Sequence, residues 1–161
     1  MTRSAAPGPI APGGDAPASG APVDAPEEDV DAVGALLGTP GTWAVVGLST
    51  NPARAAHGVA AYLRRLGHVV VPVHPDAPVV AGVAGVRRLA DLQVRPDVVD
   101  VFVNSARAGA VVDEAVAAGA RAVWLQLGVR ADAAVARARA AGVVVVEDRC
   151  PAIEGPRRGL R

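Results

Sequence analysis

Residues 42–57 read T-W-A-V-V-G-L-S-T-N-P-A-R-A-A-H, and the rest of the chain is organised around this stretch. Its apolar run, residues 43–48, is typical of a strand that is covered on both faces. A polar turn follows the run, and a helix begins after the turn. The turn offers hydroxyls and backbone N–H groups, and the helix adds its positive N-terminal end. We therefore predict that this turn binds a phosphate group.

The rest of the chain repeats the same pattern. Further apolar runs predict four more strands at residues 68–73, 98–103, 122–127 and 143–146. Apolar residues at helical spacing predict helices over residues 29–37, 59–66, 108–118 and 131–141. Residues 76–86 are glycine-rich and read as irregular, and a single helical turn is expected at residues 89–92.

Short strands that alternate with helices of about ten residues are typical of βαβ units and a parallel sheet. We predict an α/β fold, a Rossmann-like doubly wound parallel sheet of five strands in the order 3-2-1-4-5, with an N-terminal helix. Ligands of such folds bind beyond the carboxyl ends of the strands, at the switch point beside the first strand. The predicted phosphate-binding turn falls at that point.

The 161 residues fit one folded domain, predicted over residues 29–155. Residues 1–28 are rich in Pro, Ala and Gly, and predict a disordered acidic tail. Residues 156–161 are expected to form a basic C-terminal tail. The formal net charge is +0, but residues 1–31 hold six acids and one arginine. The predicted domain is therefore mildly cationic, which suits a small anionic ligand.

Composition argues against several classes of function. Aromatic residues make up only 2% of the chain, which with the weak positive charge argues against nucleic acid as a partner. No apolar run reaches the ~18–20 residues that span a bilayer, and we expect no membrane contact, no secretory signal and a cytoplasmic protein. Cys150 is the only cysteine and has no histidine after it, so we interpret it as structural. No metal cluster or catalytic constellation stands out, and we expect binding without catalysis.

The turn itself argues against a dinucleotide. Of the fingerprint G-x-G-x-x-G only the first glycine, Gly47, is present. Hydroxyls and amides of the turn can still bind phosphate oxygens, and Arg54 can add a bidentate contact. The alternative is that Thr50 or Asn51 only caps the following helix. His57 lies in the first helical turn, where it either contacts the ligand or packs.

Other strand ends point to the same crevice. His74 and Pro75 close the second strand, where the ribose or adenine of a nucleotide usually lies. Asn104 follows the third strand, and Gln126 and Gly128 lie around the end of the fourth. Polar groups placed directly after buried strands favour a role in ligand binding.

Five segments together resemble one family. They are A-V-V-G-L-S-T-N-P-A-R-A-A-H-G-V-A-A-Y-L, V-V-P-V-H-P, V-V-D-V-F, A-V-W-L-Q-L-G-V and V-V-V-E-D-R-C-P, in this order. Over about residues 29–154 the chain is similar to the small stand-alone CoA-binding-domain proteins. Their domain is similar to the CoA-binding half of the succinyl-CoA synthetase α chain.

The resemblance implies coenzyme A or an acyl-CoA as the ligand. It places the CoA phosphates on the turn at residues 49–54, the adenosine beside His74 and Pro75, and the pantetheine along Val103 and Asn104. The chain departs from the family where it has His74 in place of Asn, Ala55-Ala56 in place of Pro-Ser, and Val103-Asn104 in place of two arginines. The candidate cofactor-binding residues are Gly47, Ser49, Thr50, Asn51, Arg54, His57, His74, Pro75, Val103, Asn104, Gln126 and Gly128.

These observations predict a CoA-binding or acyl-CoA-binding protein that acts as a carrier or sensor. One alternative is an NAD(P)-binding, oxidoreductase-like protein on the same fold. Another is a regulatory partner protein that docks through its acidic tail. Whether the chain forms a homodimer stays open at this stage.

Overall fold

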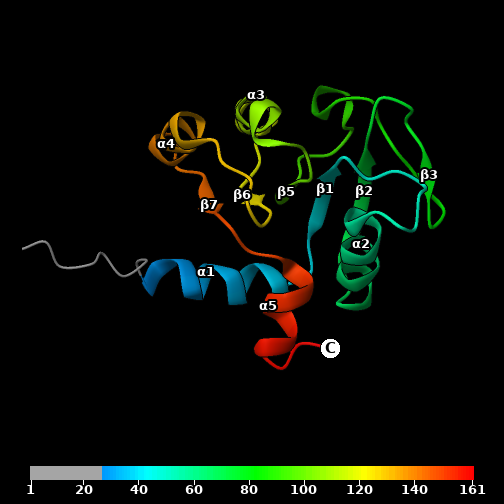
Figure 1. The fold of residues 1–161 in the computed structure, drawn as a ribbon, viewed down its shortest axis with the longest axis horizontal. Coiled ribbons are helices and arrows are strands. Elements are labelled where there is room, and N and C mark those ends of the chain that lie inside the picture. Colours follow the sequence, from blue (N-terminus) through cyan, green and yellow to red (C-terminus); the bar gives the residue numbers. More distant parts are fainter. Residues whose placement is uncertain (1–26) are drawn as a thin grey trace, which may run out of the picture.

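The computed structural model describes residues 27–161 (Figure 1). Its main sheet has five strands that pair in parallel throughout. They are β1 (Thr42–Val46), β2 (Val69–Val73), β5 (Val98–Val101), β6 (Ala122–Leu125) and β7 (Val144–Val146), in the spatial order β2-β1-β5-β6-β7. The predicted Rossmann-like α/β fold with five parallel strands is confirmed.

The order of the strands differs from the predicted 3-2-1-4-5. Counted within this sheet alone, the observed order is 2-1-3-4-5, so β2 lies at the edge and β5 lies beside β1. Pro72 in β2 gives the physical reason, because a residue without an N–H is tolerated in an edge strand, and the outer side of β2 carries one isolated bridge, between Val73 and Val86, instead of a continuous ladder. All four residues of β5 are buried, as expected for an inner strand. The switch point therefore lies between β1 and β5, still beside the first strand.

Helices cover both faces of the sheet (Figure 1). One face carries α1 (Glu27–Gly38), α2 (Ala55–Arg65) and α5 (Pro151–Arg157), and the other carries α3 (Ser105–Ala117) and α4 (Asp132–Ala140). Side chains alternate between the faces along β1: Trp43 and Val45 pack toward the first set and Ala44 toward the second. Successive residues of the strands are apolar because helices bury both faces of the sheet.

The connection from β2 to β5 contains more structure than the irregular segment expected for residues 76–86. It forms a small antiparallel hairpin of β3 (Val79–Val80) and β4 (Val83–Ala84). The predicted helical turn follows as η1 (Leu89–Asp91). Val86 donates its N–H to Pro72 O at 2.9 Å and accepts the His74 N–H at 3.0 Å. These two bonds fix the segment that precedes η1 against the end of β2.

Residues 156–161, predicted as a basic tail, take part in the fold, and the boundary predicted at residue 155 falls inside α5. The helix begins at Pro151, a residue type that favours the first helical position. Beyond its end, the Tyr62 hydroxyl donates a hydrogen bond of 2.9 Å to the Leu160 carbonyl. The predicted acidic tail, residues 1–28, lies outside the described residues except for its last two, which open α1.

Candidate functional site

A cavity of about 720 Å³ lies at the carboxyl edge of the sheet, around the switch point between β1 and β5. Its size is in the range of ordinary cofactor pockets. The walls come from the ends of β1, β2 and β5, the turn before α2, the segment before η1, and α3. The lining residues are Val46, Gly47, Ser49, Arg54, Ala55, Ala56, Val73, His74, Pro75, Arg87, Arg88, Leu89, Phe102, Val103, Asn104, Arg107, Val111 and Glu114.

The turn between β1 and α2 depends on Gly47. Its φ of +98° is a left-handed conformation, and a Cβ there would lie 2.7 Å from the Phe102 carbonyl oxygen. The Gly47 N–H donates to Val73 O at 2.9 Å, which ties the turn to β2. Glycine therefore lets the chain leave β1 close against the end of β5 and form the floor of the cavity.

The start of α2 has no side-chain cap. Its N-cap residue is Arg54, and no side chain accepts a hydrogen bond from the first helical N–H groups. Asn51 instead accepts the Ala53 N–H at 3.0 Å, and Ser49 accepts the Asn51 N–H at 3.3 Å, both within the turn. The alternative that Thr50 or Asn51 caps this helix is thus wrong. Uncapped N–H groups beside a lining serine and arginine are suited to an anion.

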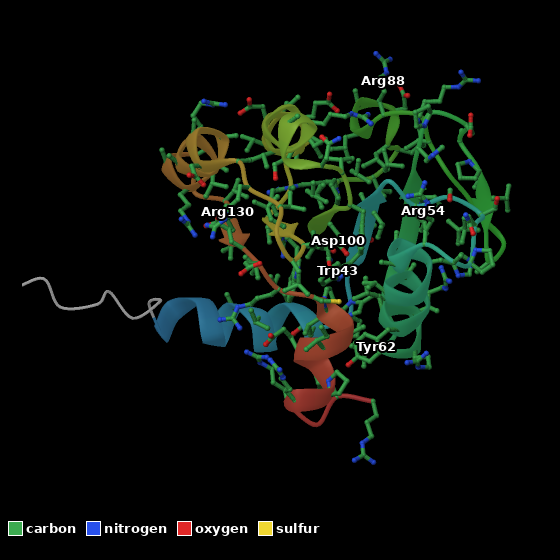
Figure 2. The ribbon with its side chains drawn as sticks, viewed as in Figure 1. Trp43, Arg54, Tyr62, Arg88, Asp100 and Arg130 are labelled. Carbon is green, nitrogen blue, oxygen red and sulfur yellow. The ribbon has the colours of Figure 1, made fainter. Side chains whose placement is uncertain are left out.

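Four arginines and one carboxylate line the cavity: Arg54, Arg87, Arg88, Arg107 and Glu114. The arginines come from three segments, namely the start of α2, the loop before η1 and the first turn of α3. Figure 2 labels two of them, Arg54 and Arg88. The excess of positive charge creates a potential that attracts anions into this part of the surface. The electrostatics therefore favour a ligand with several negative charges.

Most of the predicted site residues meet at this cavity. The structure brings seven of the twelve to its walls: Gly47, Ser49, Arg54, His74, Pro75, Val103 and Asn104. Asn104 also caps α3, where its side-chain oxygen accepts the Arg107 N–H at 3.2 Å. They meet because parallel strands end at one edge of the sheet.

The other five predicted residues do not line the cavity: Thr50, Asn51, His57, Gln126 and Gly128. Gln126 is buried, and its amide donates to Asp100 Oδ1 at 2.7 Å. Gly128 donates its N–H to Asp148 Oδ1 at 2.8 Å, which stabilises the loop after β6. The carboxyl end of β6 thus lies beside the cavity but does not contribute to its lining.

Sequence reasoning missed several lining residues. Arg87 and Arg88 belong to the connection between β2 and β5, which has no periodic pattern, and they reach the cavity because Val86 pairs with β2. Phe102 and Glu114 were also not predicted. The available signal was the arginine pair itself, which stands directly between a glycine-rich segment and a helical turn.

Asp100 lies wholly buried in the centre of β5, on the face of the sheet that also carries Trp43 (Figure 2). Burial raises the pKa of its carboxyl to about 7, against the opposing effect of hydrogen bonds from Gln126 and the Val101 amide. Its Oδ2 has no hydrogen-bond partner. The carboxyl is therefore about half protonated at pH 7 and faces the helices instead of the cavity.

Cys150 stands at the N-cap of α5 and packs against the core on the same face as Asp100. Burial raises the pKa of its thiol, and the negative charges of Asp100 and Glu154 act in the same direction. A thiol held in this state is a poor nucleophile at neutral pH. The environment agrees with the interpretation of Cys150 as structural.

His68 is a structural residue as well. Its ring bonds to the Leu37 carbonyl at 3.0 Å and accepts the Gly41 N–H at 3.2 Å, so it joins α1 to the start of β1. Burial lowers the pKa of this imidazole, which keeps it neutral. Within residues 27–161, no three His, Cys, Asp or Glu side chains come together as metal ligands. No helix in that range is both long and apolar enough to cross a bilayer.

A doubly wound parallel sheet with a cationic cavity at its switch point defines a Rossmann-like domain. Residues 41–156 match the model of one family of such domains, the CoA binding domain. The chain belongs to this family. The resemblance deduced from the five sequence segments is confirmed.

Similar proteins support this assignment. The uncharacterized protein YneT of Bacillus subtilis is 32% identical over 107 residues, which cover 66% of this chain and 79% of that protein. A solved structure from Thermus thermophilus is 35% identical, with a TM-score of 0.74, over 80% of this chain and 97% of the other. A hypothetical protein from Pyrococcus horikoshii is 30% identical, with a TM-score of 0.73, over 90% and 97% of the two chains.

Proposed function

We propose that the cavity at the carboxyl edge of the sheet binds coenzyme A or an acyl-CoA, and that the protein is a non-catalytic carrier or sensor. The observation that carries this proposal is the four-arginine cavity at the switch point of a chain that belongs to the CoA binding domain family. CoA is a polyanion with a long pantetheine arm, so it needs both cationic walls and an extended path.

The parts of CoA can be assigned to parts of the cavity. The diphosphate would bind the uncapped start of α2, beside Ser49 and Arg54. The adenosine would lie beside His74 and Pro75, and the pantetheine would follow the end of β5 at Val103. We place the protein in the cytoplasm, with a small-molecule ligand as its main partner.

Calorimetric titration of the full chain with CoA, acetyl-CoA and NADH tests this proposal. We expect saturable binding of CoA or acetyl-CoA and much weaker binding of NADH, because the turn lacks the second and third glycines of the dinucleotide fingerprint. Tight NADH binding without CoA binding would favour the oxidoreductase-like alternative. Folded protein that binds none of the three at millimolar concentration would refute the proposal.

The substitution Arg54→Ala is expected to weaken CoA binding. A charge-assisted hydrogen bond to an anion contributes about 1.5–3 kcal/mol, so the dissociation constant should rise ~10- to 100-fold. Arg121→Ala serves as the control because Arg121 lies at the opposite, amino edge of the sheet, where its one ion pair among the described residues is with Asp97 Oδ1 at 3.7 Å. Equal CoA affinities of the two variants, measured by calorimetry, would remove Arg54 from the binding site.

A further inference from the structure

The arginines that line the cavity lie on three segments, of which the first turn of α3 carries Arg107. Arg54 stands at the start of α2, next to the turn that follows β1. Arg87 and Arg88 stand in the loop before η1, directly after Val86, whose two backbone hydrogen bonds hold it against Pro72 and His74. The backbone that leads into Arg87 and Arg88 is therefore held beside the end of β2, on a different segment from the turn that would bind the diphosphate in the proposed function.

CoA carries its phosphates at two separate places along its structure. Its diphosphate links the pantetheine to the ribose, and a separate phosphomonoester stands on the 3′ oxygen of that ribose. A phosphomonoester carries about −1.5 to −2 charge at pH 7, more than either phosphate of the diphosphate. With the adenosine beside His74 and Pro75, the ribose phosphate would be the anion nearest to the loop that carries Arg87 and Arg88.

We propose that Arg87 and Arg88 bind the 3′-phosphate of CoA and make the cavity selective for CoA over dephospho-CoA. This inference rests on the proposed function. It assigns the arginine pair to one phosphate and Arg54 to the others. The family resemblance did not include either residue of the pair among the candidate contacts.

Both arginines are available for such a contact. Arg87 and Arg88 are exposed, and the Arg88 guanidinium forms one ion pair within residues 27–161, with Asp91 Oδ1 at 3.4 Å. An exposed ion pair such as Arg88–Asp91 contributes little to stability, so replacing the Asp91 carboxylate by a phosphate dianion as the partner of Arg88 costs little free energy. The planar guanidinium group binds phosphate oxygens in a bidentate manner. Glu114, the acidic residue of the lining, belongs to α3 and not to this loop.

The test is calorimetry with CoA and dephospho-CoA on the wild-type chain, the double variant Arg87→Ala/Arg88→Ala, and the control Arg121→Ala. We expect the wild-type chain and the control to bind CoA at least about tenfold more tightly than dephospho-CoA. The double variant should lose this preference entirely through weaker CoA binding. Its affinity for dephospho-CoA should change less than about twofold, because charge-assisted contacts to the diphosphate stay in place.

Three results would overturn the inference, and they differ from failure of the proposed function. Equal wild-type affinities for CoA and dephospho-CoA would show that the 3′-phosphate is not recognised. A preference that survives in the double variant would assign the recognition to other residues. An equal loss of affinity for both ligands would place the pair on the diphosphate. Failure of the proposed function itself would appear as folded wild-type protein that binds neither ligand.

A fragment experiment isolates the same contact. Adenosine 3′,5′-bisphosphate carries both phosphates of the nucleotide half of CoA, and adenosine 5′-monophosphate lacks the 3′ group. We expect the bisphosphate to compete with CoA at least about tenfold better than the monophosphate in the wild-type chain, and equally in the double variant. Equal competition in the wild-type chain would contradict the assignment.

Discussion

Replacing Asp100 by asparagine is expected to remove a large pH-dependent part of the free energy of unfolding. Burial in the centre of β5 raises the pKa of this carboxyl from 3.8 to about 7. One pKa unit corresponds to about 1.4 kcal/mol, so the group makes a pH-dependent contribution of about 4 kcal/mol. Asparagine has nearly the same shape and can accept the Gln126 hydrogen bond, but it has no ionisation to suppress.

The sign follows from which state binds the proton. Between pH 3.8 and 7 the folded protein keeps the Asp100 proton, whereas the unfolded chain has lost it. The stabilisation from this group is therefore complete below pH 3.8, decreases as the pH rises, and is lost above pH 7. The difference in stability between Asp100→Asn and the wild-type chain should increase in favour of the variant by about 4 kcal/mol from pH 4 to pH 8.

Urea unfolding at several pH values measures this difference, and subtraction of the wild-type curve cancels the titration of shared groups. Asp113→Asn is the matched control, because Asp113 is exposed and its hydrogen bond from Arg137 lowers its pKa. Its stabilising effect is present above the unfolded pKa and is lost only at more acidic pH. If the difference in free energy of unfolding between Asp100→Asn and the wild-type chain did not change between pH 4 and 8, the result would contradict a buried carboxyl with a raised pKa.

The fold could be predicted from the sequence because the buried strands are continuously apolar, whereas apolar residues in the helices recur at helical spacing. The order of the strands could not be predicted from those patterns, since an edge strand and an inner strand of a parallel sheet can be equally apolar. Pro72 is the residue that indicates the order, because it has no N–H to donate to a continuous ladder on the outer side of β2, where Val86 forms one isolated bridge. The edge position of β2 then requires the connection to cross β1 before β5.

The candidate site was predictable only where a side chain directly follows a strand. Ser49 and His74 are such residues, and their strands carry them to one edge. Gln126 follows a strand too, but residues two apart lie on one face, so it shares the face of Trp124 and reaches Asp100. The position of Arg87 at the cavity depends on long-range backbone hydrogen bonds between Val86 and the end of β2, and no local sequence pattern predicts such bonds.

Gly155→Ala is expected to destabilise the protein because the new methyl group has no space. A Cβ on Gly155 would lie 2.7 Å from Cζ of Tyr62, a buried residue of α2, and would also contact its hydroxyl oxygen. To relieve this overlap, α5 must move away from α2 and weaken the hydrogen bond from Tyr62 to the Leu160 carbonyl. Overpacking and the lost bond cost about 3 kcal/mol, of which the better helix propensity of alanine returns about 1.

Gly58→Ala provides the matched control, since it makes the same chemical change within α2 at an exposed position with no atom within 4 Å of the added Cβ. There the substitution should stabilise the protein by about 0.5–1 kcal/mol. Urea unfolding should therefore move the two midpoints in opposite directions. A Gly155→Ala variant as stable as the wild-type chain would mean that α5 does not pack this closely on α2. Opposite shifts would show that α5 packs closely on α2, because Gly155 is buried against Tyr62 whereas Gly58 is exposed.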